Sequence, residues 1–137
     1  MNRRAALAPL LLAVAVALGC PRADPDEAAV LAACEERAEA IRTLDPARYE
    51  PLVSSNYHAG EVDRAAVVAR FKRLAERRKP VLYEVLERRV EMKGGLATVH
   101  ERYRLRFETP KGPKEVEDAS RLVLAREEGR WRFVAGL

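Results

Sequence analysis

The chain has 137 residues, and its 25 lysines and arginines against 21 aspartates and glutamates leave a formal net charge of only +4. This length fits one compact domain. Because acidic and basic residues are interspersed along the chain, the charge is typical of a solvated surface and excludes the basic footprint of a nucleic-acid-binding protein.

The first twenty residues have the order of an export signal. Arg3 and Arg4 precede an apolar run over residues 5–18, and small residues then lead into Cys20. A basic start, an apolar stretch and small residues before a cut are typical of a secretory signal. The run of about 14 residues is too short to cross a bilayer, which requires roughly 20.

The segment Ala17-Leu18-Gly19-Cys20 resembles the bacterial lipobox, although Leu is usual where Ala17 stands. The resemblance implies that the Cys20 thiol takes a diacylglycerol, that the chain is cut before it, and that the new N-terminus is acylated. We therefore expect a signal peptide over 1–19, the lipidated cysteine and a short tether over 20–24, and a single domain over 25–137. The exported protein would be anchored to a membrane of the cell envelope, facing the periplasm or the cell surface. Cleavage without lipidation and export by the twin-arginine route are the alternatives.

Removal of the signal leaves 118 residues with a formal charge of +2, because the signal holds Arg3 and Arg4 and no acidic residue. With Cys20 lipidated, Cys34 is the one cysteine left, so we expect no intrachain disulfide.

The residues up to 80 predict three helices. The first begins at residues 24–27 (Asp-Pro-Asp-Glu), which combine a capping aspartate, a proline for the first turn and a glutamate at capping-box spacing. Its apolar stripe follows helical spacing and consists of Val30, Cys34, Ala38 and Ile41. A short helix is expected after residue 45, and a third from Asp63 to the stop at Pro80.

After residue 80 the apolar period becomes two, as in strands. Strands are expected over 81–92, 96–108, 115–125 and 130–135, joined at Gly94-Gly95, at residues 109–113 and at residues 127–129. Hairpins in succession make an antiparallel meander, and helices ahead of it indicate an α+β fold.

This order of elements resembles the nuclear transport factor 2-like superfamily, which includes SnoaL-like cyclases and ketosteroid isomerases. The resemblance also rests on residues 60–64 (Gly-Glu-Val-Asp-Arg) followed by Val67 and Phe71, and on the ending over 126–133 (Arg-Glu-Glu-Gly-Arg-Trp-Arg-Phe). It covers 25–137 and implies a cone, in which a curved sheet wraps around a long N-terminal helix and shorter helices close the mouth. Many unrelated activities occur on this fold, so the resemblance implies no particular reaction.

The Gly94-Gly95 turn predicts the register of the first hairpin. The expected pairs on its inner, apolar face are Val90 with Val99, Arg88 with Glu101, Leu86 with Tyr103 and Leu82 with Phe107. Extending the register across the next loop would put Tyr103 beside Ser120.

Six polar side chains are then expected inside the cone, as a candidate ligand pocket: Glu84, Arg88, Glu101, Tyr103, Asp118 and Ser120. Polar groups are costly to bury unless they are paired. Either Arg88 and Glu101 form an ion pair and Tyr103 bonds to Ser120, or these groups line a wet pocket.

The opposite face of the sheet is expected to be solvated. Its residues are Tyr83, Val85, Arg89, His100, Arg102, Arg104 and Arg106, with Val81, Ala119 and Val123 between them. Such a face could also meet an anionic partner, anionic lipid headgroups or a second copy of the chain, since relatives often form homodimers through it.

The leading hypothesis is a membrane-anchored envelope lipoprotein with a small non-catalytic domain that binds a small molecule or an envelope protein. The alternative is an enzyme of the SnoaL or isomerase type, with Asp118 or Glu101 as base and Tyr57 or Tyr103 as donor. A purely structural dimer in the envelope is a third candidate.

Two further side chains, His58 and Cys34, are candidates for chemistry. His58, expected in a loop at the mouth, could serve as an acid or base. Because it and His100 fall on different elements, no metal site is expected, and no cofactor is implied. Cys34 is expected to be a small core residue rather than a nucleophile.

Overall fold

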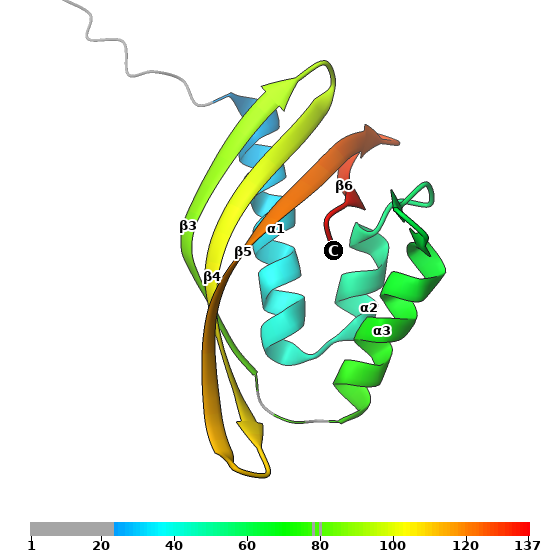
Figure 1. Cartoon of the computed structure of the whole chain (residues 1–137). Coiled ribbons are helices and arrows are strands. Elements are labelled where there is room, and N and C mark those ends of the chain that lie inside the picture. Colours follow the sequence, from blue (N-terminus) through cyan, green and yellow to red (C-terminus); the bar gives the residue numbers. More distant parts are fainter. Residues whose placement is uncertain (1–23, 78, 80) are drawn as a thin grey trace, which may run out of the picture.

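The computed structural model describes residues 24–77, 79 and 81–137 (Figure 1). The expected signal and Cys20 lie outside the described residues. The helices are α1 (Pro25–Thr43), α2 (Pro46–Tyr49), the 3-10 turn η1 (Glu50–Leu52) and α3 (Arg64–Glu76). No helix in this described part is long and apolar enough to span a bilayer.

Each of the three α-helices begins at an aspartate, as the sequence predicts. The Asp24 carboxylate accepts a hydrogen bond from the Asp26 amide at 2.9 Å, and Asp45 and Asp63 cap α2 and α3 in the same way. These carboxylates satisfy amides that have no partner within the helix. At its other end α1 stops at Leu44, which adopts the left-handed conformation with φ 52°.

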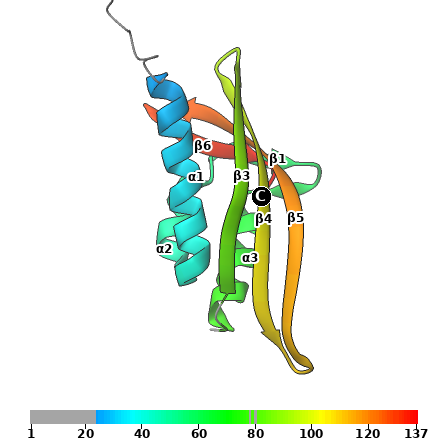
Figure 2. The same cartoon turned by 90° about the vertical axis from the view of Figure 1, so that its left-hand side faces the viewer.

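Four antiparallel strands form the main sheet in the order β3 (Val81–Lys93), β4 (Leu96–Thr109), β5 (Gly112–Glu127) and β6 (Arg130–Ala135). The sheet curves around α1, and all helices lie on its concave side (Figures 1 and 2). A separate pair, β1 (His58–Ala59) and β2 (Val62–Asp63), precedes α3. The α+β architecture predicted from the sequence is confirmed.

The predicted register of the first hairpin holds from the turn to Glu87, which pairs with Arg102, and then fails. A bulge between Val85 and Glu87 leaves Leu86 out of the pairing, so that Val85 faces Tyr103. Because successive side chains of a strand alternate between faces, one extra residue exchanges the two faces beyond it.

Five assignments in the first half of β3 are therefore wrong. Tyr83 points into the molecule and is only 4% exposed, and the half-buried Val81 points the same way. Glu84 points outward instead, and Leu82 is 51% exposed. Val85, which was expected on the outer face, pairs with Tyr103 on the inner face.

The second hairpin is tighter than expected. Its turn is Pro110-Lys111, with Thr109 paired to Gly112, instead of a loop over 109–113. The Gly112 φ of 108° is a conformation that glycine adopts without strain. Pairing shifts by two residues, which brings Tyr103 beside Asp118 and Glu101 beside Ser120. An even shift keeps each side chain on its predicted face, but the expected neighbours are wrong.

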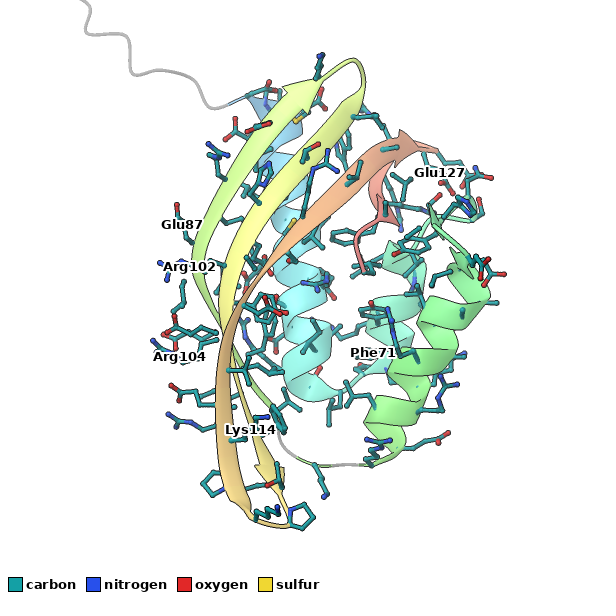
Figure 3. The ribbon with its side chains drawn as sticks, viewed as in Figure 1. Phe71, Glu87, Arg102, Arg104, Lys114 and Glu127 are labelled. Carbon is teal, nitrogen blue, oxygen red and sulfur yellow. The ribbon has the colours of Figure 1, made fainter. Side chains whose placement is uncertain are left out.

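Two apolar cores hold the helices to the sheet. The first joins α1 to the sheet and contains Val30, Cys34, Ala97, Val99, Leu122, Leu124, Trp131 and Phe133. The second lies among α1, α2 and α3 and contains Ala40, Tyr49, Val53, Tyr57, Val67, Val68 and Phe71. In it the rings of Tyr49 and Phe71 stack with centroids 4.0 Å apart, and Figure 3 shows Phe71 on the inner side of α3.

Candidate functional site

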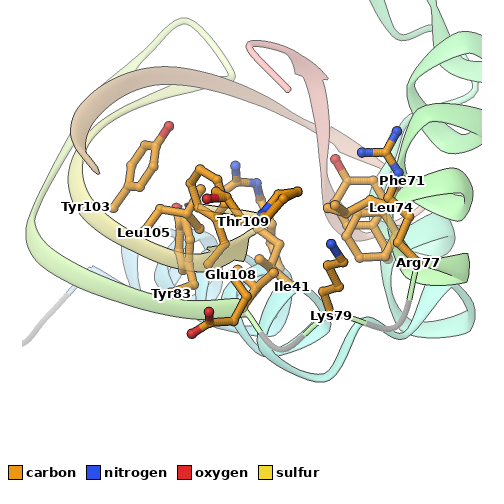
Figure 4. A pocket seen from close by; sticks show the side chains of 15 residues that line it. Ile41, Phe71, Leu74, Arg77, Lys79, Tyr83, Tyr103, Leu105, Glu108 and Thr109 are labelled. Carbon is orange, nitrogen blue, oxygen red and sulfur yellow. Dashed lines mark hydrogen bonds between the residues drawn. The ribbon is translucent and has the colours of Figure 1, made fainter. Parts of the chain in front are cut away.

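A cavity of about 560 Å³ opens at the end of the molecule where α1 and α3 finish and the β4–β5 hairpin turns (Figure 4). Its sheet wall consists of Val81, Tyr83, Tyr103, Leu105 and Phe107. Its helix wall consists of Ile41, Tyr49, Phe71 and Leu74, and charged residues at the mouth are Arg77, Lys79 and Glu108. This volume is within the range of small-molecule sites, roughly 300–1,000 Å³.

The bulge in β3 shapes the sheet wall. It turns Tyr83 inward, so that its ring stacks on that of Tyr103 with centroids 5.0 Å apart and an interplanar angle of 27°. Two adjacent aromatic rings provide a broad, rigid apolar surface.

Behind this wall lies Glu101, which is 2% exposed. One carboxylate oxygen, Oε1, accepts hydrogen bonds from the Tyr83 hydroxyl and from Arg37 Nη1, the latter at 3.3 Å. The other oxygen, Oε2, accepts from Arg88 Nε at 2.8 Å. Three donors from α1 and β3 therefore satisfy both oxygens of this buried carboxylate.

Arg37 connects Glu101 to the cavity. It projects from α1 and lines the cavity, although the residue is only 9% exposed. Nη1 also donates to the Tyr83 hydroxyl at 3.1 Å, and Nε has no hydrogen-bond partner in the described part of the chain.

The tyrosines of the cavity remain protonated at neutral pH. Burial raises the pKa of Tyr83 well above its usual value and also raises the pKa of Tyr49, in both cases against the opposing effect of the nearby Arg37 guanidinium. Burial and the Asp118 carboxylate raise the pKa of Tyr103. These hydroxyls are therefore hydrogen-bond donors and not bases.

Arg37 and Tyr83 belong to the site, but the sequence patterns do not predict them there. Arg37 lies three residues after Cys34 and four before Ile41, so a charge at helical spacing within an apolar stripe was the available signal. Tyr83 carried no such signal, because the bulge that turns it inward has no local marker in the sequence.

The structure brings together only part of the predicted site. Arg88 and Glu101 pair as expected. Glu84 is outside the cone, where it bonds to Arg104 at 3.1 Å. Asp118 is exposed, accepts a hydrogen bond from the Ala119 amide at 2.8 Å, and does not line the cavity.

The expected bond between Tyr103 and Ser120 is absent from the described residues, since the strands pair differently. Ser120 lies opposite Glu101, and its hydroxyl has no partner in that part of the chain.

The two candidates near the expected mouth also lie elsewhere. Tyr57 is buried, where its hydroxyl accepts from the Leu137 amide at 2.9 Å and donates to the Leu137 carbonyl at 3.2 Å. His58 is exposed on β1 opposite Asp63 rather than in a loop. Neither lines the cavity. The described residues hold no group of three potential ligands that could bind a metal ion.

Cys34 belongs to the apolar core, as predicted. Burial raises the pKa of its thiol to about 11, with smaller effects of nearby charged groups. A buried thiol in its protonated form is a poor nucleophile.

The outer face of the sheet is a ladder of paired charges. Glu87, Arg102 and Arg104 point away from the helices (Figure 3). Arg104 bonds to Glu117 at 2.6 Å, and neighbouring arginines and glutamates on β3, β4 and β5 pair in the same manner. This neutralised, solvated face agrees with the primary expectation from the sequence.

The geometry of the cavity suits binding better than proton abstraction. A general base must reach a substrate proton with a free lone pair at hydrogen-bond distance. Glu101 is covered by its three donors, and Asp118 lies outside the cavity. The remaining acid of the lining, Glu108, is at the exposed mouth.

A family model described as a SnoaL-like domain matches residues 30–136. No curated protein matches the chain.

Several solved structures share the fold. A protein of unknown function from Mycobacterium tuberculosis has 17% identity and a TM-score of 0.68, over 81% of this chain and 73% of its own. An NTF2-like protein with a cystatin-like fold from Novosphingobium aromaticivorans has 15% identity and a TM-score of 0.67, over 81% and 79%. A candidate ketosteroid isomerase from Shewanella frigidimarina has 16% identity and a TM-score of 0.64, over 77% and 90%. At these identities the likeness concerns the fold.

Proposed function

We propose that this chain, which belongs to the family of SnoaL-like domains, is a membrane-anchored envelope lipoprotein whose domain binds a small molecule without transforming it. One observation carries the proposal: an aromatic cavity of ligand size lies beside a buried carboxylate that three donors fully occupy. The walls supply apolar burial, which favours binding, while the carboxylate of the described lining, Glu108, lies at the exposed mouth and not against the aromatic wall.

The anchoring part of the proposal rests on the lipobox-like segment ending at Cys20. Two or three acyl chains on that residue, at about 0.8 kcal/mol per buried methylene, would hold the protein on a membrane permanently.

The fold supports an outward-facing cavity. The chain enters the domain at the start of α1, and the cavity lies at the other end of that helix. A helix of 19 residues is about 28 Å long at 1.5 Å per residue. A short tether at one end therefore leaves the mouth open to the aqueous compartment.

The test uses the domain without its signal and lipid, residues 21–137, which contains both apolar cores and every described element. Native mass spectrometry of this domain, purified from its own cells, should reveal a retained small molecule. Nile red, a neutral apolar dye, should bind with increased fluorescence.

A pair of matched variants assigns the dye to the cavity. Leu105→Trp fills the sheet wall and should abolish dye binding, whereas Leu82→Trp adds the same side chain to the exposed outer face and should leave it unchanged. Equal effects of the two variants, or no dye binding by the parent domain, would contradict the proposed binding function.

A further inference from the structure

We infer that the ligand of this cavity is an apolar monocarboxylic acid, whose carboxylate lies against Arg37 and accepts hydrogen bonds from the hydroxyls of Tyr49 and Tyr103. The inference rests on the proposed binding function and specifies the chemical class of the ligand.

The polar groups inside the cavity are hydrogen-bond donors. Arg37 can only donate, and the raised pKa values of Tyr49 and Tyr103 keep both hydroxyls protonated. The Tyr103 hydroxyl makes no hydrogen bond within the described residues, and that of Tyr49 lies close enough to Arg37 for the guanidinium to affect its pKa. A ligand that meets three donors must itself present acceptors.

The local charge favours an anionic acceptor. Arg37 and Arg88 share the single buried negative charge of Glu101. The other partner of Arg88, Glu35, has a side chain that is 56% exposed, so water screens its contribution. Arg37, Arg88 and Glu101 together therefore carry an excess positive charge next to the cavity, which a ligand carboxylate would neutralise.

The mouth of the cavity also carries more positive than negative side chains. Arg77 and Lys79 line it, and neither forms an ion pair within the described part of the chain. Figure 4 shows both at the edge of the cavity next to Leu74. One acidic residue, Glu108, opposes them. Two cations at the entrance would raise the local concentration of an anion and reduce that of a cation.

The rest of the lining requires an apolar body. Aromatic and aliphatic side chains form both walls, chiefly Tyr83, Tyr103, Leu105, Phe107, Phe71 and Leu74. A second carboxylate on the part of the ligand that lies between these walls would have no donor, at the cost of burying an unpaired charge. One carboxylate on an alkyl or aryl body is therefore the class that fits.

The experiment compares three probes with the same alkyl chain: dodecanoate, dodecanol and dodecyltrimethylammonium. Each is titrated against the domain of residues 21–137 at concentrations below micelle formation, by isothermal calorimetry and by displacement of Nile red. Dodecanoate should bind about tenfold or more tightly than dodecanol, since hydrogen bonds to a charged acceptor are about twice as strong as neutral ones. The ammonium should bind most weakly.

Variants then locate the carboxylate. Arg37→Gln should reduce the ratio of dodecanoate to dodecanol affinity to near one, whereas Arg104→Gln, on the outer face, should preserve it. Because Arg37→Gln also removes a partner of Glu101, its folding is checked by circular dichroism. The double variant Tyr49→Phe with Tyr103→Phe keeps both rings and should lower the same ratio several-fold even if Arg37→Gln does not fold.

The outcomes separate this inference from the proposed function. If dodecanol or the ammonium binds as tightly as dodecanoate, or if the double variant keeps the full ratio, the carboxylate class is wrong although the cavity still binds ligands. If neither Nile red nor any alkyl probe binds, the proposed function is wrong as well.

Discussion

Arg88 and Glu101 lie directly opposite each other on β3 and β4, and Arg88 Nε donates to Glu101 Oε2 at 2.8 Å. The pair was expected from the Gly94-Gly95 turn, because it lies between that turn and the bulge. A third residue was not expected: Arg37 on α1 donates to the same Glu101 carboxylate. Glu101 thus ties the long helix to the sheet through buried charges.

Removing Glu101 alone should destabilise the domain strongly. Glu101→Leu strands two guanidinium groups near the core and should lower the free energy of unfolding by about 3 kcal/mol or more. Adding Arg88→Met should recover part of this loss, which gives a coupling energy above about 1 kcal/mol in a double-mutant cycle measured by urea unfolding. Recovery should be incomplete because Arg37 remains without its carboxylate.

The exposed pair of Arg104 and Glu117 provides the control for this cycle. Water screens it, so its coupling should stay below about 1 kcal/mol. A coupling below about 0.5 kcal/mol for Arg88 and Glu101 would show that they do not stabilise each other.

Trp131→Ala should also destabilise the domain by about 3 kcal/mol or more, as large aromatic truncations in cores do. Trp131 is 8% exposed and belongs to the core between α1 and the sheet. Leu82→Ala, at a side chain that is 51% exposed, should change stability by less than about 0.5 kcal/mol. Similar midpoints for the two variants in urea unfolding would place Trp131 outside the stabilising core.

Unfolding should become easier between pH 9 and pH 11, partly because of Cys34. Its pKa rises from 9.0 to about 11 on folding. The folded state thus holds the thiol proton more tightly, and this stabilisation is complete below pH 9 and lost as the pH rises through 11. Two pKa units correspond to about 2–3 kcal/mol at most.

Cys34→Ala isolates this contribution from that of the buried tyrosines, whose pKa values also rise. Its free energy of unfolding should fall less steeply between pH 9 and pH 11 than that of the parent. Parallel curves for the two proteins would mean that the thiol has the same pKa in both states. In the native protein at pH 8, Cys34 should also resist iodoacetamide.

Cys20→Ser should release the protein from membranes, because serine cannot form the thioether with diacylglycerol. Fractionation followed by a high-salt wash measures this, and Cys34→Ala should fractionate like the parent. A Cys20→Ser protein that still sediments with washed membranes would contradict lipid anchoring.

Local signals in the sequence determined most of the elements. Capping aspartates with helical apolar spacing predicted the three helices, and alternation with short turns predicted the four long strands. These features act within a few residues, so they are visible without the fold. The pairing of Arg88 with Glu101 could be predicted for the same reason, because both residues lie close to the tight turn that sets the register of the hairpin.

Only the tertiary structure decided which side chains form the cavity. The bulge at Leu86 exchanges the faces of β3, which removes Glu84 from the interior and introduces Tyr83. Arg37 on α1 meets Glu101 because the curved sheet wraps around that helix. Both features depend on contacts between different elements, and both bring a donor to one buried carboxylate, which would be costly to bury unpaired.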